Sequence, residues 1–164
     1  MKENDYYKSN SEFFCNKSGY DNVVFTNAGS SAFHAFLLSQ DFELGDEIIF
    51  PVECYPTFPM IAIQSGLTPV FVDVDEHYNL CWESLKKKIT DKTKFVVVIH
   101  MAGIPAKMRE IQEVIMESNQ SNNIILIEDW CQAFGTLLKH GIKKESLTKA
   151  AILSFSSSKL LSIK

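Results

Sequence analysis

One run of five apolar residues restricts the folds open to this chain more than any other feature. Residues 95–99 read Phe-Val-Val-Val-Ile and are mostly β-branched. This composition is typical of a strand in a parallel sheet that is covered on both faces. A second run, Asn-Ile-Ile-Leu-Ile-Glu at residues 123–128, has the same character, and a helix-length segment separates the two. We therefore expect both runs to be buried strands of one sheet.

The rest of the chain repeats this order of strand, loop and helix. Short apolar runs predict further strands at residues 22–26, 47–50, 69–73 and 150–153. Apolar residues at helical spacing predict helices at residues 33–40, 58–65, 82–89 and 106–118. Such alternation implies right-handed crossovers between parallel strands. The predicted fold class is α/β, with a mainly parallel sheet and helices on both faces.

Length and charge exclude some classes of partner. A chain of 164 residues suggests one compact domain with one core. The net charge of -4 offers no basic stripe, which argues against nucleic acid as a partner. The first ten residues are polar, and the longest apolar run, residues 95–106, is too short to span a bilayer. We expect a cytoplasmic protein with no membrane partner.

Neither the cysteines nor the histidines have the spacing of a metal site. The four cysteines lie far apart without a C-x-x-C pair, and no two histidines have helical ligand spacing. The sequence therefore predicts reduced, mostly buried thiols, no disulfide framework and no metal.

Polar side chains follow several predicted strands, and they would meet at the carboxyl edge of a parallel sheet. Gly29, Ser30 and Ser31 form a tight turn that opens a helix. Free N–H groups and serine hydroxyls at such a helix start can bind a phosphate. The alternative is simple N-capping by serine.

Four more side chains of chemical interest are placed at the same edge, one of them His100 after the strand at residues 95–99. Tyr55 lies in a loop fixed by two prolines, where its ring could stack on a flat ligand or fill the core. Asp129 directly follows the strand at residues 123–128. Lys159 lies beyond the last strand and could be an amine nucleophile if it is desolvated, or a solvated lysine after a serine-rich loop.

Four motifs together resemble the DegT/DnrJ/StrS family of pyridoxal-phosphate (PLP) sugar aminotransferases, which have fold type I. The motifs are Asn-Ala-Gly-Ser-Ser-Ala-Phe-His at residues 27–34, Gly-Asp-Glu-Ile-Ile-Phe-Pro at residues 45–51, Glu-Asp-Trp-Cys-Gln-Ala at residues 128–133, and Ser-Phe-x-x-x-Lys at residues 154–159. The resemblance extends in order from about residue 12 to residue 159.

The resemblance implies a role for each of these side chains. Lys159 would form the Schiff base with PLP and then transfer protons, and Asp129 would pair with the pyridinium nitrogen. Tyr55 would stack on the ring, and Gln132 would be a further cofactor contact. The phosphate would be held by Gly29, Ser30, Ser31 and Ser154. Members that lack the lysine do other chemistry on sugars, so Lys159 favours amino transfer.

The implied function is amination of a nucleotide-linked keto sugar by an amino acid donor, with glutamate expected. Such reactions belong to surface polysaccharide or deoxyaminosugar biosynthesis, and the family implies a homodimer. Trp130 and Cys131 stand where the family usually has small residues, and Phe134 stands where histidine is frequent. These departures predict an altered ring pocket.

The family continues past its lysine with a further strand and a small C-terminal domain. We therefore expect an N-terminal segment at residues 1–21, a partial PLP-binding large domain at residues 22–164, and no small C-terminal domain. Two alternatives remain at this point. One is a truncated, inactive member that retains a partial PLP-binding or dimerising module. The other is a generic α/β binding domain without PLP.

Overall fold

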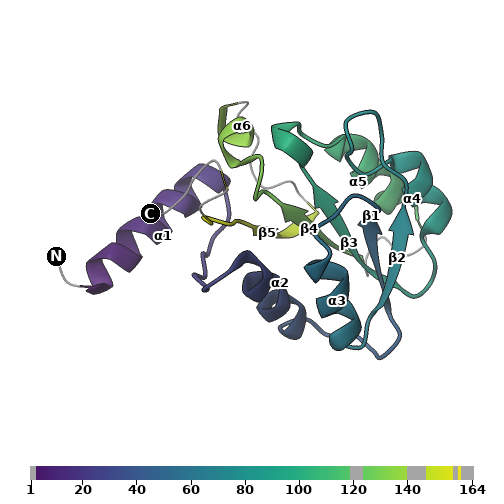
Figure 1. Ribbon diagram of the computed structural model, residues 1–164, viewed down its shortest axis with the longest axis horizontal. Helices are drawn as coiled ribbons and strands as arrows, with labels where there is room; N and C mark the ends of the chain where they lie inside the picture. Colours follow the sequence, from purple (N-terminus) through teal and green to yellow (C-terminus); the bar gives the residue numbers. More distant parts are fainter. Residues whose placement is uncertain (1–2, 119–123, 140–146, 157–158, 160–164) are drawn as a thin grey trace.

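Five parallel strands form the sheet at the centre of the molecule (Figure 1). The computed structural model describes residues 3–118, 124–139, 147–156 and 159. The strand order is β2-β1-β3-β4-β5. The bounds are Glu47–Pro51 for β1, Thr68–Val72 for β2, Thr93–Ile99 for β3, Ile125–Asp129 for β4 and Thr148–Ile152 for β5. The predicted α/β fold with a parallel sheet is confirmed.

β3 is the central strand, and its composition explains its position. The run at residues 95–99 is at most 2% exposed along its whole length. Its residues pair in parallel with β1 on one side and β4 on the other, where Phe95 lies opposite Ile125 and Ile99 opposite Asp129. A strand with neighbours on both sides and helices on both faces has no polar surroundings, so every side chain of this run is apolar.

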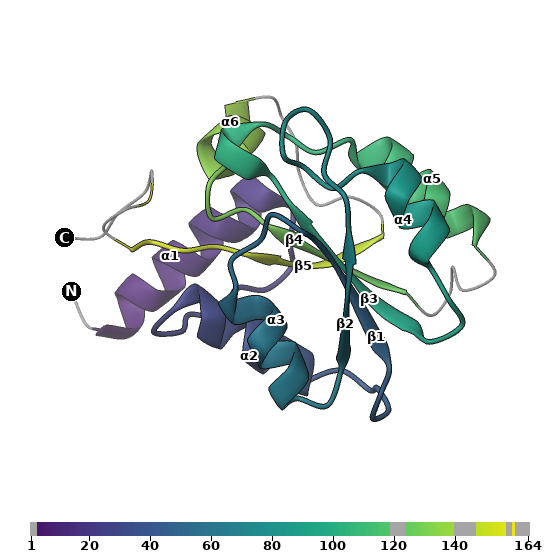
Figure 2. The same cartoon turned by 45° about the vertical axis from the view of Figure 1, so that its right-hand side comes forward.

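The helices α2 (Gly29–Leu38) and α3 (Thr57–Gln64) cover one face of the sheet. Figures 1 and 2 show both helices on the same side of the strands. Phe33 of α2 stacks on Phe58 of α3 with ring centroids 4.3 Å apart, and both rings pack over Phe50 and Ile127. This face is called the front face below.

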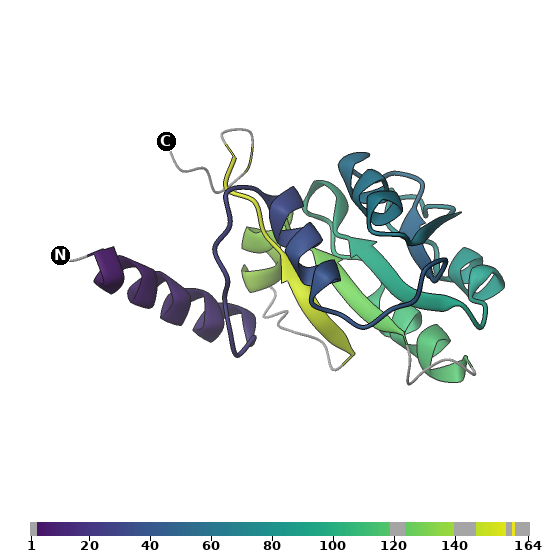
Figure 3. The same cartoon turned by 90° about the horizontal axis from the view of Figure 1, so that it is seen from below.

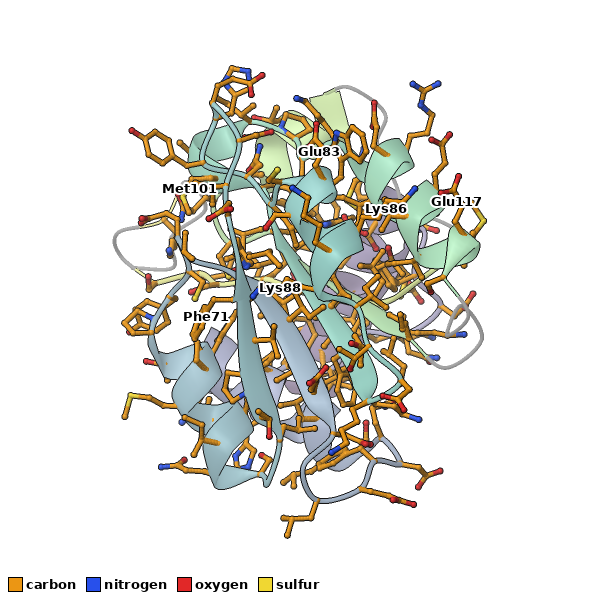
Figure 4. All side chains as sticks on the ribbon, turned by 90° about the vertical axis from the view of Figure 1, so that its right-hand side faces the viewer. Phe71, Glu83, Lys86, Lys88, Met101 and Glu117 are labelled. Carbon is orange, nitrogen blue, oxygen red and sulfur yellow. The ribbon has the colours of Figure 1, made fainter. Side chains whose placement is uncertain are left out.

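The opposite face, called the back face, is covered by α4 (Trp82–Lys88) and α5 (Met108–Glu117). Leu85 and Ile111 pack with Val96 and Leu126 of the strands. Lys86 of α4 lies beside Glu117 of α5, and their charged atoms are 3.0 Å apart (Figure 4). Both side chains are largely exposed, so this pair contributes little to stability compared with the apolar contacts beneath it.

The helix α1 (Glu3–Ser18) extends away from the sheet, as Figure 3 shows. Its Phe14 ring lies 5.5 Å from Phe134 and 5.4 Å from Phe155. Phe134 begins the short helix α6 (Phe134–Lys139), which the sequence patterns do not predict. Trp130 joins this smaller apolar cluster on the back face. In the part of the chain that the structure describes, no helix could cross a membrane.

The predicted strand at residues 22–26 is wrong. This segment is extended but pairs with no strand of the described sheet. Its apolar side chains instead contact α1, where the Tyr7 ring lies 5.1 Å from Phe25 and the Tyr7 hydroxyl donates to the Val23 carbonyl at 3.4 Å. Val24 is 76% exposed. An apolar, β-branched pattern therefore reflects packing against a helix here, and not membership of the sheet.

Candidate active site

The start of α2 lies against the end of β5. A Cβ atom added at Gly29 would lie 3.5 Å from both the Leu153 carbonyl oxygen and the Ser154 Cβ. The residue before the helix is Ala28, which has an extended backbone and makes no side-chain cap hydrogen bond. Ser30 and Ser31 therefore occupy the first turn rather than the N-cap position. The N–H groups of this turn and the Ser154 side chain lie at the same corner of the sheet.

Asp129 ends β4 and lies on the front face. Since Ile127 packs under α2 and α3, strand alternation places the Asp129 side chain on that same face. The side chain is 7% exposed, and its Oδ1 accepts a hydrogen bond from the Cys131 N–H at 2.8 Å. The backbone is also held, because the Asp129 carbonyl accepts from the His100 N–H at 3.3 Å.

The charges of Asp129 and Lys159 both act on the Cys131 thiol. Burial raises the pKa of the Cys131 thiol, and the charge of Asp129 together with a hydrogen bond to it raises that pKa further. The positive charge of Lys159 acts in the opposite direction. The Lys159 N–H donates to the Ser156 carbonyl at 2.9 Å, and its side chain is half-buried. The side chains of Asp129 and Lys159 are therefore both close enough to Cys131 to change its pKa, in opposite directions.

Tyr55 is not core filler, because its side chain is 62% exposed. Its ring meets Phe58 edge-on, with centroids 6.3 Å apart at 88°. The neighbouring Cys54 thiol has its pKa raised to about 11, by burial first and then by the charges of Glu53 and Asp129. The loop that holds Tyr55 is therefore close enough to Asp129 to feel its charge, and the ring has a free face for stacking.

Gln132 connects two loops at this edge. Its Oε1 accepts a hydrogen bond from the Ala102 N–H at 3.1 Å. Ala102 lies in the short 3-10 helix η1 (Met101–Gly103) with a left-handed backbone, φ 51°, which is uncommon for a residue other than glycine. In this structure Gln132 holds that loop in place. Its role as a cofactor contact stays a prediction.

A buried hydrogen-bond network lies behind Asp129, on the back face, and the sequence patterns do not predict it. The His100 Nε2 and the Trp130 Nε1 each lie 2.8 Å from the same oxygen, Oε2 of Glu128. All three side chains have 0% exposure. The available signal is a glutamate within an otherwise apolar strand, at the end of the strand next to His100. These three residues are called the back-side network below.

A groove with a volume of about 790 Å³ runs along the outer side of β5, between α1 and α2. It begins at Gly29 and Ser154 and is lined further along by Phe14 and Phe36. Among the described residues, no group of three histidine, cysteine, aspartate or glutamate side chains could hold a metal ion. All four cysteines are free and half-buried, so they are less buried than the sequence predicts.

Comparison with known proteins identifies relatives along almost the whole chain. The sequence profile of the DegT/DnrJ/EryC1/StrS aminotransferase family matches residues 4–163. The chain is 36% identical over 112 residues to a GDP-perosamine synthase of Escherichia coli O157:H7, covering 68% of this chain and 30% of the relative. It is 32% identical over 149 residues to a GDP-perosamine synthase of Caulobacter vibrioides, covering 90% of this chain and 39% of the relative.

The structure also resembles a solved relative with a cofactor. The E. coli GDP-4-keto-6-deoxy-D-mannose-3-dehydratase with bound hydrated PLP matches with a TM-score of 0.70 and 33% identity, over 81% of this chain and 34% of that chain. The present chain spans about a third of the length of its relatives, with 28% to 39% of each curated relative covered.

Proposed function

Since the chain belongs to the DegT/DnrJ/EryC1/StrS aminotransferase family, we propose that it binds pyridoxal 5'-phosphate and takes part in the amination of a nucleotide-linked keto sugar. Glutamate is the proposed amino donor, and a homodimer is the proposed assembly. The GDP-perosamine synthases among its relatives support the sugar class and a place in surface polysaccharide or deoxyaminosugar biosynthesis. The cytoplasm is the proposed compartment.

The observation that carries the proposal is that three separate parts of the chain converge at one edge of the sheet. A Cβ atom added at Gly29, in the first turn of α2, would lie 3.5 Å from the Ser154 Cβ, while Asp129 and Lys159 both act on the Cys131 thiol. Each part alone has a structural explanation. A helix N-terminus, a carboxylate and a lysine amine at the carboxyl ends of parallel strands together support an anionic, ring-containing ligand.

The residues present fit PLP chemically. The close approach at Gly29 leaves no room for a large side chain between α2 and β5, so backbone N–H groups can approach a phosphate there. The Asp129 carboxylate has one oxygen held by the Cys131 N–H and can accept from a protonated ring nitrogen. The Tyr55 ring is exposed and can stack on a planar cofactor.

Each of these groups has a distinct task in amino transfer. PLP, when bound, supplies an electron sink that stabilises negative charge on the substrate carbon. Asp129 holds the proton on the ring nitrogen, which an anionic neighbour favours. Lys159 provides the amine that fixes the cofactor and then moves a proton at its Nζ atom. The first turn of α2 and Ser154 hold the phosphate and so orient the whole cofactor.

The test is a spectral titration of the purified chain with PLP, followed by borohydride reduction and mapping of the labelled lysine. We expect a visible absorbance band, reduction at Lys159, and loss of both in Lys159→Ala. Lys88→Ala, on α4 at the back face, is the matched control and should keep the band (Figure 4).

Two results would contradict the proposal. One is the absence of a band in the unmodified chain. The other is a label spread over surface lysines and unchanged by Lys159→Ala. A band at Lys159 without turnover of glutamate would limit the chain to cofactor binding.

A further inference from the structure

We propose that Trp130 and Glu128 are positioning residues, which hold Asp129 in place through the back-side network. The inference rests on the proposed function for its chemical meaning, because Asp129 is the residue that would meet the cofactor's ring nitrogen. Its structural content, the coupling between Trp130 and Asp129, can be measured without cofactor.

The protonation of the network follows from its partners. The Ala106 N–H donates to His100 Nδ1 at 3.0 Å, so the ring proton of His100 is on Nε2. His100 therefore donates to Glu128 Oε2 at 2.8 Å, and the Trp130 indole N–H donates to the same oxygen at 2.8 Å. Two N–H donors on one oxygen are suited to an ionised carboxylate. The network thus fixes Oε2 of Glu128 between two N–H donors, while Oε1 is buried and has no hydrogen-bond partner among the described residues.

The donors of the network are also the backbone neighbours of Asp129. The His100 N–H donates to the Asp129 carbonyl at 3.3 Å. The Trp130 N–H donates to the Ile152 carbonyl at 2.9 Å, which connects the end of β4 to β5. Glu128 Oε2 ties the side chains of these same two residues together behind the sheet. The backbone around Asp129 is therefore fixed both in the sheet plane and from the back face.

Packing around Trp130 makes this arrangement rigid. Its ring lies 5.9 Å from Tyr20 and 6.2 Å from Phe134, and the side chain is fully buried. Burial, and next the charge of Glu128, raise the pKa of the Tyr20 hydroxyl, so Tyr20 also lies close to the network. A buried charge is costly unless its partners are well oriented. Loss of one donor should therefore shift Glu128 and, with it, the end of β4.

Trp130→Phe is the informative substitution, since it keeps an aromatic ring but deletes the indole N–H together with part of the ring volume. Phe134→Leu is the matched control, because it weakens the same apolar cluster without touching Glu128. The first readout is hydrogen exchange of the Cys131 amide, which donates to Asp129 Oδ1, in the chain without cofactor. The second is the dissociation constant for PLP.

In Trp130→Phe we expect exchange of the Cys131 amide to be about tenfold faster and PLP binding about tenfold weaker. Phe134→Leu should change the exchange rate of the Cys131 amide and the dissociation constant for PLP only as far as its loss of global stability requires. If Trp130→Phe does not fold, Glu128→Gln replaces it with the same expected local change.

The positioning role would be overturned if the Cys131 amide exchanged in Trp130→Phe at the same rate as in the unmodified chain. It would also be overturned if Phe134→Leu changed this rate as much as Trp130→Phe does. A chain that binds no PLP but shows faster Cys131 exchange in Trp130→Phe would remove the proposed function and support the coupling. The two failures are therefore distinguishable.

Discussion

Glu128 and Asp129 are neighbours in the chain, yet their carboxylates have opposite surroundings. Glu128 lies on the back face, has 0% exposure, and receives N–H groups from His100 and Trp130. Asp129 lies on the front face and receives one backbone N–H, and its charge acts on the thiols of two neighbouring loops. Oε2 of Glu128 is bound by two protein N–H groups, although its Oε1 is buried and has no hydrogen-bond partner among the described residues. The Asp129 carboxylate accepts from one backbone N–H and keeps capacity for a ligand.

If the proposed function holds, this difference lets one strand serve stability and chemistry together. Successive side chains of a strand point to opposite faces, so a structural carboxylate and a proposed cofactor-binding one can be adjacent without sharing an environment. On the back face the carboxylate is held by hydrogen bonds from two buried side chains, while on the front face the carboxylate accepts one backbone N–H. Substitutions at the two positions should therefore affect different properties.

The largest effect on stability is expected for Glu128→Ala. The substitution leaves the N–H groups of His100 and Trp130 buried without an acceptor, and should lower the free energy of unfolding by about 3 kcal/mol. Asp129→Ala should cost only about 1 kcal/mol, because it removes a single backbone partner. Urea denaturation of both variants measures this difference. Equal losses of unfolding free energy in the two variants would contradict the different structural roles of the two carboxylates.

A smaller effect concerns the reactivity of the Cys131 thiol. The Asp129 charge raises the pKa of this thiol and the Lys159 charge lowers it. Asp129→Asn should therefore increase the thiolate fraction at pH 8 and speed alkylation about threefold, whereas Lys159→Ala should slow alkylation by a similar factor. Mass spectrometry of the alkylated peptides gives the rates, with Cys15 of α1 as internal reference. Alkylation rates of Cys131 that stay unchanged in both variants would show that the charges of Asp129 and Lys159 do not act on this thiol.

The smallest effect on stability is expected for Gly29→Ala. An added methyl group would meet Leu153 and Ser154 at ordinary contact distances of 3.5 Å, so the free energy of unfolding should stay within about 1 kcal/mol of the original. The methyl group would narrow the approach to the α2 N–H groups and weaken PLP binding about threefold. Gly135→Ala in α6, where a Cβ meets no atom within 4 Å, is the matched control for fluorescence titration. Equal PLP affinities would argue against a phosphate at Gly29.

The sheet was predictable because its strands are short apolar runs whose composition depends on burial alone. The run at residues 95–99 could form little else than a central strand. The segment at residues 22–26 has a similar composition, but its contacts with Tyr7 of α1 depend on tertiary packing that no local pattern contains. The six-residue helix α6 is too short to show helical periodicity.

Of the candidate site, only the residues on the front face could be predicted from the sequence. Strand ends and motif spacing place Asp129, Lys159 and Gly29 at one edge, and the structure brings them there. The back-side network joins residues 28 positions apart through side-chain atoms, which spacing along the chain does not reveal. Gln132 is a further case, since its bond to Ala102 depends on how two loops meet.

The pair of adjacent carboxylates also protects the sheet against mispairing. A shift of β4 by one residue against β3 would reverse the faces of all its side chains. Asp129 would then enter the closed layer beneath α5, and Glu128 would leave the indole and imidazole N–H groups without an acceptor. Apolar side chains alone would penalise such a slip weakly, since Ile125, Leu126 and Ile127 are similar in size and polarity. The charged end of β4 therefore fixes the alignment that its apolar residues leave ambiguous.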